Sequence, residues 1–386
     1  MRVTGGQTDE MLARHIIRES KDILNWIVEQ GVRWQPSLGG TLSLGRTNSF
    51  FLGGGRAMLN ALYLTAERLG VEVEYDAEVT DLAIEDGMFL AARLKRPIKG
   101  ETEIRATSLV AAAGGFEANI EWLKQYWGEA ADNFLIRGTP YNRGSILKML
   151  LDKGVQEVGD PTQCHAVAID ARAPKFDGGI ITRHDSVVFG IVVNKHAQRF
   201  YDEGEDIWPK RYAIWGRLVA AQPDQIAYII FDSTVVTSFM PTLFPPIAGQ
   251  TVAELAGKLE LDPAALEKTI TEFNAAVRPG TFDHTILDDC RTEGITPEKT
   301  HWARRIETPL AYPVRPGITF TYLGTRVNKE ARMLMEGGKP SANMFAAGEI
   351  MAGNVLGKGY AAGMGMTIGS VFGRIAGREA AKHARN

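Results

Sequence analysis

The sequence has few cysteines, no surplus of basic charge and no long hydrophobic run. Cys164 and Cys290 are too few for a disulfide framework or a metal cluster, and they fit a reducing compartment. The 43 Lys and Arg residues are outnumbered by 46 Asp and Glu residues, and this balance excludes nucleic acid as an expected partner. No stretch reaches the roughly 18 apolar residues that a membrane-spanning helix needs. We therefore expect a protein that binds neither nucleic acid nor a metal.

The first residues lack the apolar segment of a signal peptide. Arg2, Asp9 and Glu10 interrupt them, and Thr4-Gly5-Gly6 is typical of a loop rather than of a first strand. We expect a cytoplasmic protein, or one held at the inner membrane by a partner. The length of 386 residues is enough for two or three domains with cores of their own.

Helical and strand-like patterns alternate in the first part of the chain. Apolar residues recur at helical spacing over 8–30 and 56–69, and a further helix is predicted for 143–155. Residues 71–79 alternate as a half-buried strand does. Leu109–Gly115 is a short apolar run that closes on two glycines and precedes a helix. This order predicts an α/β layer in which the backbone approaches another group closely.

The middle of the chain has a different composition. Residues 161–320 are richer in Trp, Tyr, Pro and charge, and glycine-rich sequence returns over 344–379. The predicted elements of the middle are a strand at 226–231 and helices at 251–259 and 263–276. We therefore expect a discontinuous α/β domain, residues 1–160 and 321–386, interrupted by an α+β capping domain of residues 161–320.

Several motifs occur in the order and approximate spacing of one known family. They are Val110–Phe116, Gln163–His165, Arg199–Glu203, Pro316–Ile318 and Ala346–Glu349. In these the chain resembles the flavoprotein family of fumarate reductase, succinate dehydrogenase and 3-ketosteroid dehydrogenase. The resemblance covers nearly the whole chain and implies a glutathione-reductase-like FAD-binding domain with an inserted cap. The longer strings Gly159–Ala166, Trp208–Trp215 and Gly348–Asn354 are most similar to the tricarballylate dehydrogenases of that family, and precorrin-3B synthase flavoproteins are similar too.

The resemblance implies a set of FAD contacts. It places a strand end beside the adenine, a glycine turn near the dinucleotide, an acid on a ribityl hydroxyl, and a helix N-terminus at the flavin O2 and N1 edge, where the helix dipole favours the anionic reduced flavin. Ser145 lies where many relatives have an aspartate. The implied cofactor-binding residues are Val79, Ala112, Ala113, Gly114, Gly115, Ser145, Glu349, Gly365, Met366 and Thr367.

One element that the family leads us to expect is not in the sequence. A G-x-G-x-x-G fingerprint after a first strand, with an acidic residue some 20 positions later, does not occur near the start of the chain. A sheet without its central strand would expose an edge and a core face. We therefore expect that the true start lies upstream and that this chain is a fragment of an FAD-binding domain, lacking the first βαβ unit. The alternative is a flavin-free fragment without catalysis.

The implied reaction is removal of two hydrogens across a C–C bond. It needs a base, a hydride acceptor and cations that hold carboxylates, for which arginine is suited by its two parallel donors. The candidate catalytic residues are His165, Tyr360, Arg211 and Glu203, and the candidate substrate-binding residues are Arg46, Arg143 and Lys358. Tyr141, Tyr201 and Tyr212 cannot be ranked from the sequence.

Departures from fumarate reductase indicate the direction of the reaction. The position of its proton-donating arginine falls at about Val236, which cannot carry a proton, and its second histidine corresponds to Phe320. The expected function is oxidation of tricarballylate to cis-aconitate, with electrons passing to a separate iron–sulfur or membrane protein. A 3-ketosteroid dehydrogenase-like or precorrin-3B synthase-like oxidoreductase is the alternative enzyme.

Overall fold

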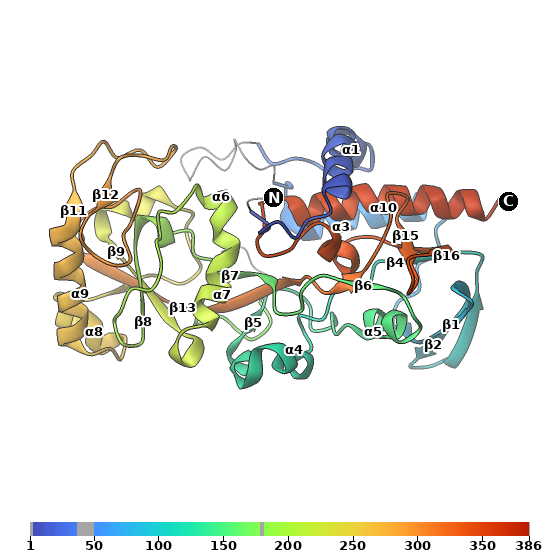
Figure 1. Ribbon diagram of the computed structural model, residues 1–386, viewed down its shortest axis with the longest axis horizontal. Helices are drawn as coiled ribbons and strands as arrows, with labels where there is room; N and C mark the ends of the chain where they lie inside the picture. The colour runs from blue at the N-terminus through green and yellow to red at the C-terminus, as the bar shows by residue number, and fades with distance from the viewer. Residues whose placement is uncertain (1–2, 37–49, 178–180, 386) are drawn as a thin grey trace.

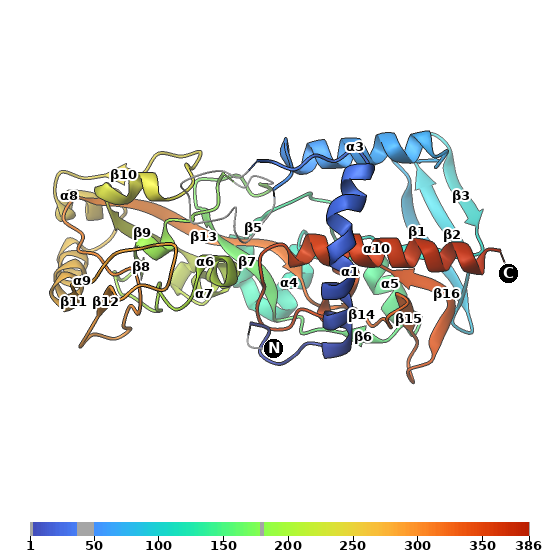
Figure 2. The same cartoon turned by 90° about the horizontal axis from the view of Figure 1, so that it is seen from above.

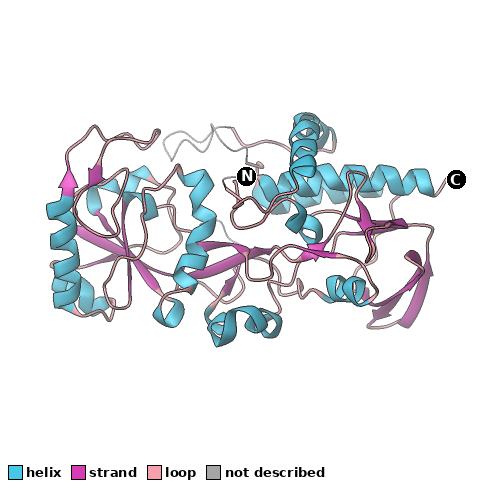
Figure 3. Ribbon diagram, in the orientation of Figure 1, coloured by secondary structure: helices cyan, strands magenta, loops and turns pink. Residues whose placement is uncertain are grey.

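The computed structural model describes residues 3–36, 50–177, 181–385, and it forms an elongated molecule with two lobes (Figure 1). One lobe lies at the right of Figure 1 and contains β1, β2, β15, β16 and α10. The other lies at the left and contains β8, β9, α8 and α9. Both lobes mix helices and strands, as Figure 3 shows, so the α/β fold class predicted from the sequence is confirmed.

The right-hand lobe combines two small sheets with three long helices. Its strands are β1 (Glu78–Glu85), β2 (Met88–Arg96), β3 (Gly100–Arg105), β4 (Leu109–Ala111), β15 (Arg332–Leu334) and β16 (Pro340–Ala346). Its helices are α1 (Glu10–Glu29), α3 (Gly54–Arg68), α5 (Ser145–Asp152) and α10 (Met364–His383), with the 3-10 helix η6 (Glu349–Asn354). The first sheet has the order β1-β2-β3, and the second has the order β15-β16-β4. Strands β4 and β16 are parallel, so their carboxyl ends meet at one edge.

The left-hand lobe is built on a six-stranded sheet. Its strands are β5 (Leu135–Ile136), β7 (Cys164–Asp170), β8 (Gly190–Asn194), β9 (Ala227–Asp232), β10 (Ile247–Ala248) and β13 (Pro309–Thr321). Its other elements are α6 (Trp208–Arg211), α7 (Trp215–Ala220), α8 (Val252–Lys258), α9 (Pro263–Ala276), β11 (Val277–Arg278) and β12 (Arg291–Thr292). Helix α4 (Ile120–Trp127) lies near the middle of the molecule, and the paired strands β6 (Glu157–Val158) and β14 (Gly324–Thr325) lie on the side of β15 (Figure 2). Strands β7, β8 and β9 are buried throughout, as a strand covered on both faces must be.

Strand β13 connects the two lobes. It pairs antiparallel with β9 in the left-hand lobe through Pro309–Val314 and with β7 through Val314–Thr321. Figure 2 shows it running from α8 towards the middle of the molecule. Residues far apart in the sequence therefore meet at its carboxyl end. The boundaries at residues 160 and 321 stay a prediction, and β5 joins the six-stranded sheet from the segment before residue 161.

Most of the predicted elements are present with small shifts. The helix of residues 8–30 is α1, capped by Asp9, whose carboxylate accepts a hydrogen bond from the Leu12 amide at 3.0 Å. The prediction for 71–79 is wrong over its first seven residues, because residues 71–77 pair with no strand and β1 begins at Glu78. The prediction rested on alternating apolar and polar residues, and this pattern does not identify a strand to pair with. Val71, Val73 and Tyr75 are exposed. Within the described residues, none of the helices combines the length and the hydrophobicity that crossing a bilayer requires.

Candidate functional site

A glycine turn follows β4 at the carboxyl edge of the small parallel sheet. Gly114 adopts φ 74°, a left-handed conformation that glycine reaches without strain. At Gly115 a Cβ atom would lie 2.0 Å from the Thr321 hydroxyl oxygen and 2.2 Å from a Glu349 carboxylate oxygen. Only glycine fits at position 115, and it brings the backbone of the turn against β13 and η6.

Two carboxyl groups lie behind this turn, the buried Glu117 and the half-buried Glu349, and we call them the carboxylate pair. Glu349 accepts hydrogen bonds from the Thr321 amide at 2.8 Å and the Thr321 hydroxyl at 3.0 Å, and Glu117 accepts one from the Asn142 side chain at 2.6 Å. Burial raises the pKa of Glu349 well above its usual range, and the nearby Glu117 carboxylate adds to the effect. Burial also raises the pKa of Glu117. The second Glu117 oxygen, Oε2, is buried without a hydrogen-bond partner.

His165 lies on β7, opposite Phe320 of β13, at the junction of the lobes. Its Nε2 atom is 3.3 Å from the Tyr212 hydroxyl, its ring centroid is 4.1 Å from that of Tyr360, and its Nδ1 atom is buried without a hydrogen-bond partner. Burial lowers the pKa of His165 well below its usual value, and the positive charges of Arg137 and Arg183 lower it further. The imidazole is therefore neutral at neutral pH and has one ring nitrogen that no protein group occupies.

Two arginines approach the same histidine. The Arg137 guanidinium donates to the Thr319 hydroxyl at 3.0 Å, and Arg183 forms an ion pair with Asp185 at 2.7 Å. The Arg183 guanidinium also lies 4.8 Å from the centroid of the Tyr212 ring. We call Arg137, Arg183, His165, Tyr212 and Tyr360 the hinge cluster.

Tyr360 joins the hinge cluster to the N-terminus of α10. Its hydroxyl accepts a hydrogen bond from the Gly365 amide at 2.8 Å, within the first turn of the helix. Helix N-termini carry unpaired amides and a partial positive charge. Gly363, the residue before the helix, has φ 86°. The neighbouring candidate Met366 is exposed, and the Thr367 hydroxyl donates to the Gly363 carbonyl.

The glycine turn and the hinge cluster are continuous in space. Phe320 faces His165 across two paired strands, while the next residue, Thr321, binds Glu349. The candidates His165, Tyr360, Gly365, Gly115 and Glu349 are thus linked by direct contacts along the end of β13. Ala112 and Ala113, which follow β4, are exposed beside this row.

The structure does not bring the other candidate catalytic residues into this row. Glu203 is buried in an ion pair with Arg199 at 2.6 Å, and its other oxygen accepts from the Val192 amide at 2.8 Å. Arg211 binds Glu205 at 2.6 Å. These contacts give both residues a structural partner, and their predicted catalytic roles stay predictions.

The remaining candidates are scattered. Arg143, Ser145 and Lys358 are exposed, and Ser145 is the first residue of α5. Val79 is half-buried on β1, which lies away from β7 in both views (Figures 1 and 2). Arg46 lies outside the described residues.

Sequence reasoning missed Arg137, Arg183 and Glu117. Each is one of many similar charges in the sequence, and only burial distinguishes them. A usable signal was present for Glu117, because it directly follows the Gly-Gly-Phe turn. Arg137 follows the apolar pair of β5, and a charge at the end of a buried strand is a candidate site residue by position alone.

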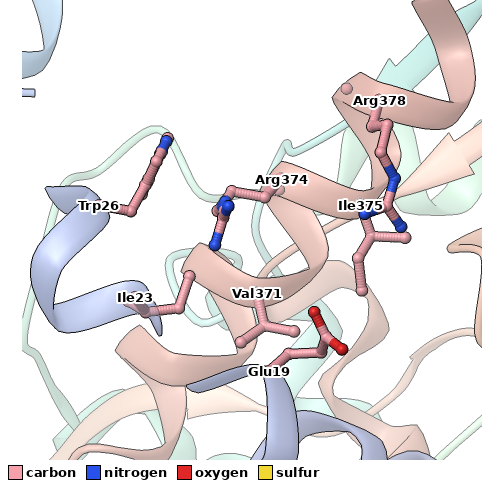
Figure 4. A pocket seen from close by; sticks show the side chains of 9 residues that line it. Glu19, Ile23, Trp26, Val371, Arg374, Ile375 and Arg378 are labelled. Atoms are coloured by element: carbon pink, nitrogen blue, oxygen red, sulfur yellow. The ribbon is translucent and has the colours of Figure 1, made fainter. Parts of the chain in front are cut away.

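A groove of about 430 Å³ between α1 and α10 lies apart from the predicted residues (Figure 4). Its labelled lining includes Ile23 and Trp26 of α1 and Arg374 of α10, and the Arg374 guanidinium lies 5.2 Å from the centroid of the Trp26 ring. The lining residues include no pair of groups suited to acid–base work. We assign no chemistry to this groove.

Comparison with known proteins identifies the family. The model of the FAD binding domain family matches residues 1–368. This chain belongs to the FAD-binding domain family. Its cofactor is FAD, as the sequence predicted.

Curated proteins resemble the chain over most of its length. It is 24% identical to the NADH:fumarate oxidoreductase of Klebsiella pneumoniae over 98% of this chain and 40% of that protein. It is 28% identical to a probable fumarate reductase of Shewanella frigidimarina over 92% of this chain and 60% of that protein. The chain thus spans about half the length of the curated relatives it matches.

Solved structures share the fold of this FAD-binding domain. The open form of a flavocytochrome c3 fumarate reductase gives a TM-score of 0.73 at 24% identity, over 100% of this chain and 66% of that one. A 3-ketosteroid dehydrogenase from Rhodococcus jostii gives a TM-score of 0.69 at 24% identity, over 98% of this chain and 81% of that one.

The residues of the row fit the flavin and ribityl part of FAD. The glycine turn gives close backbone approach, and the paired carboxyl groups of Glu117 and Glu349 offer oxygen atoms to the hydroxyl groups of a ribityl chain. The Gly365 amide already donates to the Tyr360 hydroxyl. That Glu349 and Gly365 hold this part of the cofactor stays a prediction.

Proposed function

We propose that this chain carries the catalytic centre of an FAD-dependent dehydrogenase that oxidises a C–C bond of a small polycarboxylate, converting tricarballylate to cis-aconitate. The observation that carries the proposal is the contact of His165 with Tyr360, whose hydroxyl in turn binds the first turn of α10. Acid–base groups thereby adjoin the residues that fit the flavin. FAD, when bound, supplies the acceptor for the hydride.

The pKa shifts assign different roles to the three titrating groups of the hinge cluster. Burial raises the pKa of Tyr212 and that of Tyr360, so both phenols keep their protons at neutral pH. His165 is neutral, because burial lowers its pKa. We therefore assign the His165 Nδ1 atom as the base that takes the proton next to a substrate carboxylate, with Nε2–H donating to the Tyr212 hydroxyl oxygen, which orients the ring. Tyr360 then serves as a hydrogen-bond donor rather than as a base.

The charge of the site favours an anionic substrate over a sterol. Arg137 and Arg183 face the cluster, and a guanidinium in a partly desolvated site binds a carboxylate more strongly than it does in water. Arg183 is paired with Asp185, but a sterol would bury the charge of Arg137 without an ion-pair partner, which is costly. This supports tricarballylate over a ketosteroid. The electrons would pass to a separate iron–sulfur or membrane electron-transfer protein.

A dye-coupled assay tests the proposal. The full chain is loaded with FAD and mixed with tricarballylate and a phenazine dye, and fumarate and 4-androstene-3,17-dione are run in parallel. We expect dye reduction with tricarballylate, and cis-aconitate as the product. Turnover of the ketosteroid or of fumarate without turnover of tricarballylate would contradict the substrate assignment. A chain that stays colourless after incubation with FAD would instead support the flavin-free alternative.

A further inference from the structure

We propose that Arg137 and Arg183 form an anion subsite that binds a carboxylate of the substrate remote from the bond that is oxidised. The inference rests on the proposed function and extends it by naming the residues that select a polycarboxylate. The resemblance pointed instead to Arg46, Arg143, Arg211 and Lys358. Of these, Arg143 and Lys358 are exposed and Arg211 already has a carboxylate partner.

Arg137 has donors that the protein does not use. It follows β5 and is half-buried, and its guanidinium donates to the neutral Thr319 hydroxyl. None of the ion pairs within the described part of the chain includes Arg137. Its Nε atom is buried without a hydrogen-bond partner. A buried guanidinium donor normally has an acceptor, so an external acceptor is the simplest explanation.

Arg183 has only part of its donor set satisfied. One terminal nitrogen binds Asp185, whose other oxygen accepts from the Trp208 indole at 2.7 Å, and Nε is buried without a partner. Asp185 and Trp208 hold the guanidinium against the face of the Tyr212 ring. The arginine is therefore oriented in advance, and a ligand carboxylate would need little rearrangement to bind it.

The two guanidinium groups also repel each other. Burial lowers the pKa of Arg137 to about 10, and the charge of Arg183 is the next cause. Arg137 has no ion-pair partner among the described residues, whereas Arg199 and Arg172 each bind a carboxylate directly, at 2.6 Å and 2.7 Å. A ligand anion at the hinge would relieve the repulsion and supply the missing acceptors at once. A monoanion would satisfy the subsite alone, whereas a polycarboxylate can reach both the subsite and the neighbourhood of His165.

Equilibrium binding tests the subsite without turnover. Isothermal titration of the flavin-free and FAD-loaded full chain with tricarballylate is compared with titration with butyrate, which has a single carboxylate. For both Arg137→Gln and Arg183→Gln we expect tricarballylate to bind at least about tenfold more weakly, since each removes a charge-assisted hydrogen bond. The affinity for tricarballylate should also fall as ionic strength rises.

Arg315→Gln is the matched control. Arg315 lies on β13, donates to a neutral acceptor, the Asp224 carbonyl, at 2.9 Å, and is absent from the ion pairs of the described residues. Its loss should leave binding unchanged. Arg137→Lys keeps the charge without the planar fork, and we expect it to recover part of the affinity. A thermal melt without ligand checks that each variant is folded.

The outcomes separate the two proposals. Binding that is unchanged in folded Arg137→Gln and Arg183→Gln would overturn the subsite, even if the dye assay succeeds. Arginine-dependent binding together with turnover of a different polycarboxylate would reject tricarballylate oxidation and leave the subsite standing. An equal loss in Arg315→Gln would show only a general charge effect and would also overturn the subsite.

Discussion

The carboxylate pair and the hinge cluster lie at the same end of β13 but differ in their ionisable groups, which are two carboxyl groups in the pair and two guanidinium groups in the cluster. Thr321 binds Glu349 of the pair, and Thr319, two residues earlier, accepts from Arg137 of the cluster. Within the described residues, the Arg137 Nε atom of the cluster is buried without a hydrogen-bond partner, whereas the two carboxyl groups of the pair interact with each other. The end of β13 thus separates a pair of carboxyl groups from a pair of guanidinium groups.

This difference assigns two parts of a reaction to two places. An acidic surface beside a glycine turn suits the hydroxyl groups of a ribityl chain, and a basic surface beside a neutral histidine suits a carboxylate. The helix α10 N-terminus lies between them through the contact of Gly365 with Tyr360. Acidic groups that suit hydroxyl donors and basic groups that suit a carboxylate lie at neighbouring positions. Together they indicate a site for two ligands more strongly than either set would alone.

The largest expected effect is on kcat, and it comes from removing the proposed base, His165, from the hinge cluster. Replacing His165 with Ala removes the group that we assign to proton transfer, and kcat should fall by about 10²–10⁴ in the dye-coupled assay. The affinity for tricarballylate should change much less, because Arg137 and Arg183 remain. His196→Ala, at an exposed histidine that follows β8, is the control. Unchanged turnover in His165→Ala would remove this residue from the catalytic centre.

The next largest effect is on stability, and it comes from a substitution in the glycine turn beside the carboxylate pair. Gly115→Ala would place a methyl group into the space of the Thr321 hydroxyl, which is buried, and of the half-buried Glu349 carboxyl group. We expect a loss of about 1–3 kcal/mol in the free energy of unfolding, and more if neither group can move. Urea denaturation measures the loss, and the flavin content after purification reports on the turn.

Gly373→Ala is the matched control for this turn. Nothing lies within 4 Å of a Cβ atom at Gly373, which is inside α10, so the same change should stabilise the helix by about 0.5–1 kcal/mol. Equal stability changes of the same sign in both variants would contradict the packing argument.

On the acidic side the sequence proposed Glu349 but not Glu117. On the basic side it proposed His165 and Tyr360 but not the two arginines, and the roles of all these residues stay predictions. Gly115, Glu349 and Gly365 belong to motifs whose spacing depends on backbone geometry, and such geometry leaves a pattern in the sequence. Arg137 and Arg183 follow no pattern, because their role depends on burial and on which charges lack a partner, and both depend on tertiary packing. The same limit explains Arg211, which resembles a substrate ligand in the sequence and binds Glu205 in the fold.

The elements themselves show a similar contrast. The amphipathic pattern of α1 correctly predicted Leu12, Ile16, Ile23 and Ile27 as buried, although Met11, Ile17 and Leu24 of the same stripe are exposed. A helix forms its own hydrogen bonds, so periodicity suffices to predict it. A strand needs a partner, and the alternating residues 71–77 have none within the described residues. Local rules therefore predict helices and turns, while pairing and charge balance need the whole fold.

A smaller effect is expected in how the stability of the folded chain depends on pH, because Glu349 of the carboxylate pair titrates. The folded-state pKa of Glu349 is raised above its unfolded value, so the folded chain binds more protons and its stability should fall as pH rises above about 4.3 towards that folded pKa. Glu349→Gln cannot ionise and should flatten this slope in the flavin-free chain. Urea midpoints at several pH values above 4.5 measure the difference from the unsubstituted chain. Glu267→Gln, at an exposed position of α9, should keep the original slope, and a parallel change in both variants would contradict the assignment.

The smallest effect tests the link between the two sides. Tyr360→Phe removes the acceptor of the Gly365 amide and leaves a donor in the first turn of α10 without its protein partner. The free energy of unfolding should fall by about 0.5–1.5 kcal/mol, the usual net contribution of one hydrogen bond, and amide hydrogen exchange at Gly365 should become faster. Tyr63→Phe, at an exposed tyrosine of α3, should change neither quantity. If exchange at Gly365 is unaltered in Tyr360→Phe, the hydroxyl does not join the hinge cluster to α10, and the two sides of the site are coupled only through β13.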